Sequence, residues 1–257
     1  MAETSSIEWT NATWNPWHGC IKVSPGCKNC YMYRDKKRYG QNPKQIVRSK
    51  TTFSAPLDWN QPRLIFTCSW SDWFIEEADE WRDEAWSVIR ATPYHTYQIL
   101  TKRPDRILGH LPTDWGVGWH NVWLGVSIES QDYIDRKQTL CEAPAQVRFI
   151  SAEPLLGPLD LGALDRIHWV ITGGESGPKA RPMDMDWVRS IRYQCQRAQV
   201  PYFHKQNGGT TRLNGTWGGR LVDGRTWDAL PLRWHTSNAS SAAVMFGTPT
   251  VPLGGAA

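Results

Sequence analysis

The alternation of short apolar runs with stretches of helical periodicity is the feature that most constrains how this chain folds. Residues 78–91, for example, carry Trp81, Ala85, Val88 and Ile89 at the i, i+4, i+7 and i+8 positions of one helix face, and the apolar run that precedes them is typical of a buried strand. Repeated strand–helix units predict a parallel sheet with helical crossovers. We therefore expect an α/β fold, a partial (β/α) barrel of about six or seven parallel strands.

The expected strands are residues 5–10, 64–68, 97–100, 122–128, 147–151, 167–172 and 202–204, and the expected helices are residues 29–39, 78–91, 105–111, 131–141 and 186–198. One barrel domain over residues 1–231 accommodates all of them, because a chain of 257 residues fits one large domain.

Four segments stand outside this alternation. Residues 15–31 form a cysteine-rich loop, and residues 40–62 are irregular and broken by proline, which predicts an insertion or a lid. Residues 208–225 are rich in Gly and Thr and are expected to form a hairpin on the rim of the barrel. The composition of residues 232–257, mostly Ser, Ala, Gly and Pro, predicts a disordered tail.

The cysteine loop holds Cys20, Cys27 and Cys30 within eleven residues. Gly and Pro between them allow the loop to fold back so that three sulfurs converge, and thiolates are ligands for soft metal centres. Three interpretations remain open: a [4Fe–4S] cluster with one iron left open, a zinc ion with His18 as the fourth ligand, or three free thiols in a packed loop. An iron–sulfur cluster is the leading one, because His18 and Cys20 are closer in sequence than zinc ligands usually are.

Charged and hydroxyl side chains follow the expected strands, at the edge where a barrel places its chemistry. Long charged residues are poor helix caps, so Lys102 and Glu153 are candidate catalytic residues, whereas hydroxyl residues at these positions could simply cap helices. Cys68 could donate a hydrogen atom to a substrate radical, or could be a small buried residue. The run from Gly173 to Gly177 could form an anion-binding nest that holds a cofactor, or only a tight turn. The nest interpretation makes cofactor ligands of Gly173, Gly174 and Glu175.

The chain carries a net charge of +4 with a pI of about 8.7, which permits an anionic substrate without requiring one. It contains 16 Trp residues, so many indole rings must lie in the core or line a cavity. We expect no contact with a membrane, because no apolar run is long enough to cross one and no signal peptide is evident. The remaining cysteines are scattered among predicted elements, which favours the reducing cytoplasm.

The loop resembles a known pattern. NPWHGC followed by GCKNCY is similar to the cluster loop of radical S-adenosylmethionine (SAM) enzymes, above all the spore-photoproduct-lyase-like branch. Up to about Pro231 the chain resembles a phage and prophage three-cysteine-motif family of undefined activity. That resemblance is carried by TWNPWHGCIKVSPGCKNCY, SWSDWF, LTKRPDRI, LGVSIES, SAEPLLGPLDL, VITGGESGPKARPM and DGRTWDALP.

The radical-SAM resemblance implies an enzyme with a [4Fe–4S] cluster on Cys20, Cys27 and Cys30. It implies reductive cleavage of SAM to a 5′-deoxyadenosyl radical. The phage context of the three-cysteine-motif family and the mild basicity of the chain favour a nucleotide or nucleic-acid base as the substrate of that radical. A reductant such as flavodoxin or ferredoxin would supply the electron, and a genome-neighbour partner protein could contribute. The residues that by chain order match SAM-contacting positions are Ser69, Ser71, Asp72, Ser127, Glu129 and Arg136.

Two other functions compete with this one. In the first, zinc stabilises a non-catalytic module that binds nucleic acid or a protein. In the second, Glu153, Glu175 and Lys102 perform hydrolytic or transfer chemistry without a metal.

Overall fold

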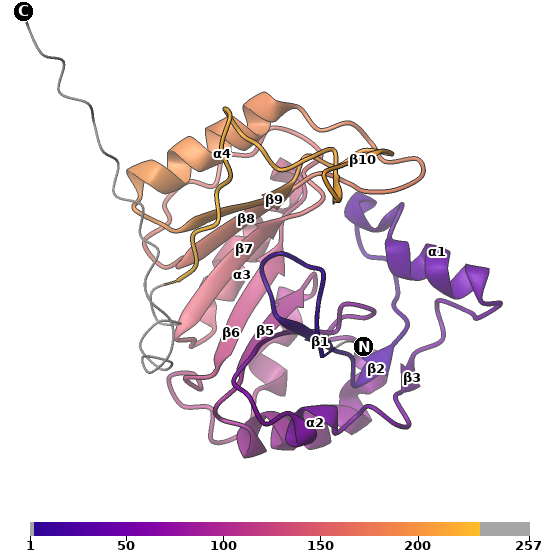
Figure 1. Ribbon diagram of the computed structural model, residues 1–257. Helices are drawn as coiled ribbons and strands as arrows, with labels where there is room; N and C mark the ends of the chain where they lie inside the picture. Colours follow the sequence, from indigo (N-terminus) through magenta and orange to yellow (C-terminus); the bar gives the residue numbers. More distant parts are fainter. Residues whose placement is uncertain (1–2, 232–257) are drawn as a thin grey trace, which may run out of the picture.

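A seven-stranded parallel sheet curves into a half-barrel and forms the frame of the protein (Figure 1). This computed structural model describes residues 3–231. The strand order along the sheet is β1-β4-β5-β6-β7-β8-β9, so each strand pairs with the sheet strand that follows it along the chain, and all six pairings are parallel. The predicted fold class, a partial (β/α) barrel of parallel strands, is confirmed. The predicted tail, residues 232–257, lies outside the described residues.

The sheet strands are β1 (Ala12–Trp14), β4 (Leu64–Thr67), β5 (Thr96–Thr101), β6 (Val122–Ser127), β7 (Val147–Ala152), β8 (Trp169–Gly173) and β9 (Tyr202–Gln206). The helices are α1 (Tyr31–Arg38), α2 (Asp79–Ala91), α3 (Asp135–Glu142) and α4 (Met185–Arg197).

Alternating side chains of the strands form two apolar layers, one on each face of the sheet. Leu124 and Val126 of β6 belong to the layer that also contains Ala85 of α2 and Ile191 of α4. Trp123, which directly precedes Leu124, belongs to a second layer on the concave face. Side chains alternate faces along a strand, so a sheet covered by helices on one side and by chain on the other buries both sets.

The prediction of a first strand at residues 5–10 is wrong, because the first strand of the sheet is β1, which begins at Ala12. Residues 5–10 fold back as a turn, with the Thr10 amide donating to the Ile7 carbonyl, and carry Trp9 into the hollow of the half-barrel. There the Trp9 ring lies 4.7 Å from the ring of Phe66 and 6.1 Å from that of Trp169. The alternation of Ile7 and Trp9 therefore reflects packing inside the barrel and not strand pairing.

The segment 40–62, predicted as an insertion or a lid, packs beside the cysteine loop, where the Cys20 amide donates to the Pro43 carbonyl at 3.0 Å. Its strand β3 (Val47–Arg48) pairs antiparallel with β2 (Trp17–His18), and the Trp14 indole donates to the Phe53 carbonyl at 2.9 Å. The buried rings of Phe53 and Trp59 pack the segment onto the core. The rim hairpin predicted within residues 208–225 contains the antiparallel strands β10 (Arg212–Leu213) and β11 (Thr216–Trp217).

Two predicted helices are shorter than expected. Residues 105–111 form two successive 3-10 turns, Pro104–Arg106 and Leu108–His110, because Pro112 disfavours helical backbone at the residue before it. A 3-10 turn at Gln131–Tyr133 precedes α3. Within residues 3–231, none of the helices has the length and apolar character needed to cross a membrane.

Candidate functional site

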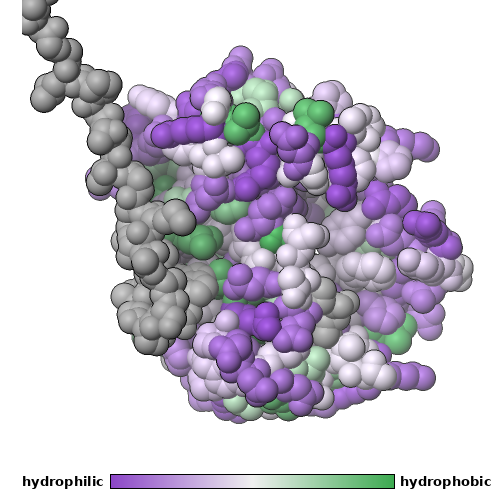
Figure 2. All heavy atoms as spheres, in the orientation of Figure 1, coloured by the Kyte–Doolittle hydropathy of each residue, from purple (hydrophilic) through white to green (hydrophobic). Residues whose placement is uncertain are grey.

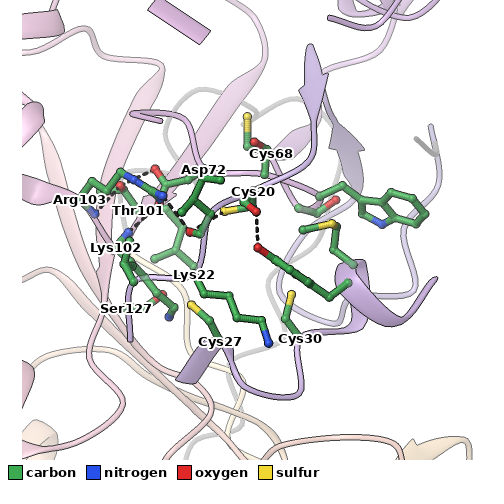
Figure 3. Close-up of a pocket in the computed structure, with 18 of the residues that line it drawn as sticks. Cys20, Lys22, Cys27, Cys30, Cys68, Asp72, Thr101, Lys102, Arg103 and Ser127 are labelled. Carbon is green, nitrogen blue, oxygen red and sulfur yellow. Dashed lines mark hydrogen bonds and ion pairs between the residues drawn. The ribbon is translucent and has the colours of Figure 1, made fainter. Parts of the chain in front are cut away.

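Cys20, Cys27 and Cys30 line one cavity of about 130 Å³ at the carboxyl ends of the strands (Figure 3). Local backbone geometry brings them together. Gly19 has a φ of +100°, and a Cβ there would lie 2.2 Å from the Gln45 carbonyl oxygen, so the turn before Cys20 requires glycine. The 3-10 turn Pro25–Cys27 then bends the chain back before α1 begins. The spacing of the three cysteines therefore helps to bring their thiols to one cavity.

Two of the three loop thiols in this cavity, those of Cys20 and Cys30, have a raised pKa, which favours their neutral form. Burial raises the pKa of Cys20 to about 12, and the nearby Asp72 carboxylate adds to the effect, while the Arg103 guanidinium opposes it. Burial also raises the pKa of Cys30, against the cation of Lys102. Metal ligation requires thiolates, so a metal bound here would release protons, and the two cations would offset the negative charge that remains.

The donor set suits an iron–sulfur cluster better than a single metal ion. Within the described part of the chain, no three His, Cys, Asp or Glu side chains lie close enough together to hold one ion. A cluster bonds its thiolates to different irons, so they need not meet at one point. His18, the expected fourth zinc ligand, does not line the cavity; its neighbour is Lys36, and burial followed by that charge lowers the pKa of its imidazole. Three soft thiols with cations beside them therefore fit a cluster.

Glu129 anchors the cysteine loop to the end of β6. Its carboxylate is fully buried, accepts from Arg136 Nη1 at 2.8 Å, and lies 3.7 Å from Lys102 Nζ. The Ser24 hydroxyl of the cysteine loop donates to the same carboxylate. A Cβ at Gly26 would lie 2.6 Å from Glu129 Oε1, so this glycine leaves room for the carboxylate. Glu129 and Arg136 were expected to contact SAM; here they bond each other, and neither is among the described residues that line the cysteine cavity.

Glu175 anchors the loop from β8 in a similar way. It accepts from Asn29, inside the Cys27–Cys30 segment, at 2.8 Å and from Arg181 at 2.5 and 2.9 Å. Arg181 also donates to the Pro25 carbonyl at 3.1 Å. Burial raises the pKa of Glu175, but the hydrogen bonds from Arg181 and Asn29 outweigh burial, so the pKa lies below its usual value. Glu175 is therefore an ionised positioning group for the loop.

Asp72, after β4, provides the third anchor. Its carboxylate accepts from the Thr101 hydroxyl at 2.6 Å and the Lys102 amide at 2.9 Å, and it pairs with Arg103 at 3.1 Å. Arg103 in turn donates to the Ile21 carbonyl of the cysteine loop at 2.9 Å. The Asp72 carboxylate thus fixes the end of β5 against the loop.

The two serines before Asp72 also bind the cysteine-loop region. The Ser71 hydroxyl donates to the Gly19 carbonyl at 2.6 Å, and the Ser69 hydroxyl bonds the Asn15 side chain at 3.1 Å. Both serines line the cysteine cavity together with Asp72 and Ser127. These four predicted cofactor ligands are therefore the ones that the fold gathers around the thiols.

Cys68 is the fourth cysteine at the cavity (Figure 3). It is buried, and its φ of +54° is a left-handed conformation that is uncommon for residues other than glycine. Burial, followed by the charge of Asp72, raises the pKa of its thiol well above the usual range. Cys68 is thus a neutral S–H group, as a hydrogen-atom donor would have to be.

A second cavity, of about 210 Å³, adjoins the first and shares Cys27, Cys30 and Lys102 with it. Its other walls are formed by Tyr31, Glu153, Pro154, Gly174, Glu175, Ser176, Lys205 and Gln206, with Gly26 and Asn29 of the cysteine loop. The two cavities meet at two of the three loop cysteines, so a ligand in the second cavity would lie beside a metal centre in the first.

Opposite charges face each other in this second cavity. Glu153 Oε1 lies 3.2 Å from Lys205 Nζ, and Glu153 Oε2 accepts from the Ser151 hydroxyl at 3.1 Å. A Cβ at Gly173 would lie 2.5 Å from Glu153 Oε1, so Gly173 makes space for this carboxylate. A ligand that carries both a cationic and an anionic group could bind Glu153 with the first and Lys205 with the second.

The run from Gly173 to Gly177 is built for close backbone contact. The Gly174 amide donates to the Gln206 carbonyl at 2.9 Å and the Gly177 amide to the Gly209 carbonyl at 3.0 Å. A Cβ at Gly174 would lie 2.1 Å from the Asn207 carbonyl oxygen. Two of the amides expected to form an anion nest are therefore engaged with protein carbonyls, which supports the tight-turn interpretation.

Sequence comparison places this chain in a family. Its residues 4–231 match the family described as "Protein of unknown function (DUF5131)". The chain belongs to the DUF5131 family. No curated protein and no solved structure matches it.

Several groups of this DUF5131 protein's site escaped the sequence analysis. The contacting residues that were not assigned a role are Lys205 at the end of β9, Arg181 after β8, and Ser24, Asn29 and Tyr31 of the cysteine loop, because the spacing that marks the cysteines says nothing about the residues beside them. The sequence signal that could have identified residues such as Lys205 is their position directly after a strand, because polar residues that follow the strands of a parallel sheet meet at one edge. Order cannot say which of those residues bond one another, so the internal pairing of Glu129 with Arg136 was not foreseen.

Proposed function

We propose that this protein is a radical SAM-type iron–sulfur enzyme in which Cys20, Cys27 and Cys30 hold a [4Fe–4S] cluster. The observation that carries the proposal is that three thiols from one loop line a single cavity at the carboxyl ends of a parallel half-barrel. A bound cluster would supply the electron for reductive cleavage of SAM. A nucleotide or nucleic-acid base as substrate, a flavodoxin or ferredoxin reductant and a genome-neighbour partner stay predictions.

The surrounding residues support this function through position and charge. Lys102 belongs to both cavities and brings a cation next to the thiols. Glu153 and Lys205 form the polar wall of the second cavity and suit the amine and carboxylate of an amino-acid moiety such as that of SAM. Buried anchors on Glu129 and Glu175 keep the cysteine loop over the barrel mouth, where water is limited.

Anaerobic reconstitution with iron and sulfide tests the proposal. We expect the protein to take up four irons per chain, as a [4Fe–4S] cluster requires, and to convert SAM into 5′-deoxyadenosine when a strong reductant is added. Replacing Cys20, Cys27 or Cys30 with serine should abolish both. The matched control is Cys141→Ser, on α3, because that partly buried thiol lies outside both cavities.

Other outcomes separate the competing functions. One tightly bound zinc without iron would favour the zinc-stabilised binding module. A cluster that forms but never cleaves SAM would reject the enzymatic proposal. A Cys20→Ser variant that keeps the full activity of the wild type would favour metal-free chemistry by Lys102, Glu153 and Glu175.

A further inference from the structure

Positive charge is concentrated in one short part of the chain. Residues 20–50 contain nine Lys or Arg and one acidic residue, Asp35, a net charge of +8. The whole chain has a net charge of +4, so the rest of it is net negative by four. The mild basicity of the protein therefore conceals a strongly cationic segment, which comprises the cysteine loop, α1 and the strand β3.

Most of these cations are on the surface and without acidic partners. Among the described residues, acidic side chains pair with only two of the nine: Asp35 with Arg34, and Glu84 with Arg48. Lys36 is buried. We define the basic face by the exposed cations of the segment, which are Lys22, Lys28, Arg34, Lys37, Arg38, Lys44 and Lys50.

The basic face adjoins the second cavity. α1 lies at the edge of the half-barrel (Figure 1), where the surface is predominantly hydrophilic (Figure 2). Its first residue, Tyr31, is 38% exposed and also lines the second cavity. One turn later, Arg34 Nη1 lies 2.5 Å from where a Cβ of Gly177 would be, so the helix packs against the loop after β8. Tyr39, at the other end of α1, is 67% exposed.

We propose that the basic face binds the phosphate backbone of a single-stranded nucleic acid and directs one nucleotide of it into the second cavity. Unpaired surface cations bind a polyanion by releasing its counterions, and exposed aromatic rings among them can stack bases. A single strand is favoured over a duplex because a base must leave the stack to enter a cavity walled by Tyr31, Glu153 and Lys205. The substrate role rests on the proposed SAM chemistry, whereas the binding does not.

The test measures binding of the full chain to a fluorescently labelled single strand of about 16 nucleotides by anisotropy at several salt concentrations, without SAM or reductant. The test variant is Lys37→Gln/Arg38→Gln/Lys44→Gln. The matched control is Arg90→Gln/Arg166→Gln/Arg197→Gln, which removes three exposed cations from α2, the approach to β8 and the end of α4.

For the test variant we expect roughly 10- to 100-fold weaker binding at about 0.1 M salt. The slope of log affinity against log salt concentration should also be shallower by about 2, because each of the three lost phosphate contacts contributes about 0.7 to that slope. The control variant should bind as the wild type does. Equal weakening in both variants would overturn the proposal, because general charge rather than this face would then be responsible.

Two further arms make the result specific. Preference for a duplex of the same sequence, or for vesicles of phosphatidylserine and phosphatidylcholine over the single strand, would reject the proposed ligand. If the protein binds the strand through this face but does not cleave SAM, the binding proposal stands and only the proposed enzymatic function is rejected. If the protein cleaves SAM but does not bind the strand, only the binding proposal is rejected.

Discussion

Replacing Glu129 with glutamine is the sharpest test of how the cysteine loop is held. The change keeps the size of the side chain and removes its negative charge. Glu129 is fully buried, and Arg136, its partner at 2.8 Å, is only 9% exposed. The substitution therefore leaves a buried guanidinium without its counter-charge, and the Ser24 hydroxyl loses a charged acceptor.

The magnitude follows from these contacts. A hydrogen bond to a charged group contributes about 1.5–3 kcal/mol and a neutral one about 1 kcal/mol, so the Arg136 and Ser24 contacts together lose about 1–4 kcal/mol. Removing one partner of a buried ion pair costs about 3–5 kcal/mol when nothing replaces it, which sets an upper limit for an isosteric change. We expect Glu129→Gln to lower the free energy of unfolding by about 2–3 kcal/mol.

Urea denaturation followed by tryptophan fluorescence measures this loss, since the chain has 16 Trp. With a denaturant slope of about 2–3 kcal/mol per molar, the midpoint should fall by about 1 M. The control is Glu84→Gln, which removes an exposed carboxylate paired with Arg48 and should cost about 0–1 kcal/mol. A Glu129→Gln variant no less stable than the control would refute the view that this buried carboxylate anchors the loop.

Two further predictions concern the strand ends beside the second cavity. Gly174→Ala should lower the free energy of unfolding by about 1–3 kcal/mol in thermal denaturation, because the new methyl group would meet the carbonyl oxygen of Asn207, whose own amide is bonded to the Gly219 carbonyl. The control is Gly109→Ala, which has open space around it and should change stability by less than about 0.5 kcal/mol. Equal effects of the two substitutions would contradict the clash at Gly174. Burial lowers the pKa of His204 in the folded protein, so the His204 side chain takes up a proton at a higher pH in the unfolded chain than in the folded one. The stability that the neutral imidazole contributes is therefore fully present above about pH 6.5 and should be lost as the pH falls below that value. His204→Gln should flatten this loss in denaturation curves between about pH 7 and pH 5, and an unchanged slope would show that His204 is not its source.

The sequence was sufficient for the frame because the frame depends on local pattern. Apolar runs separated by helical periods specify buried strands with crossovers, and a parallel sheet then brings every strand's carboxyl end to one edge. The gathering of Cys20, Cys27 and Cys30 begins with their spacing, but contacts from distant segments, such as Glu129 with Ser24 and Glu175 with Asn29, hold the loop in place. The pattern misled where an alternating segment, residues 5–10, packs into the barrel without pairing, and where the predicted helices over 105–111 and 131–141 are partly or wholly 3-10 turns.

Only the tertiary structure decided which polar groups meet. Glu129 and Ser24 are 105 residues apart in sequence, and Glu175 and Asn29 are 146 apart, so their contacts depend on how the curved sheet positions distant loops. Several acids and bases reach the same edge, and burial favours pairing among them: Glu129 pairs with Arg136, and Glu153 pairs with Lys205 at the cavity wall. Spacing along a chain carries no information about that competition, because it is resolved by distances in three dimensions.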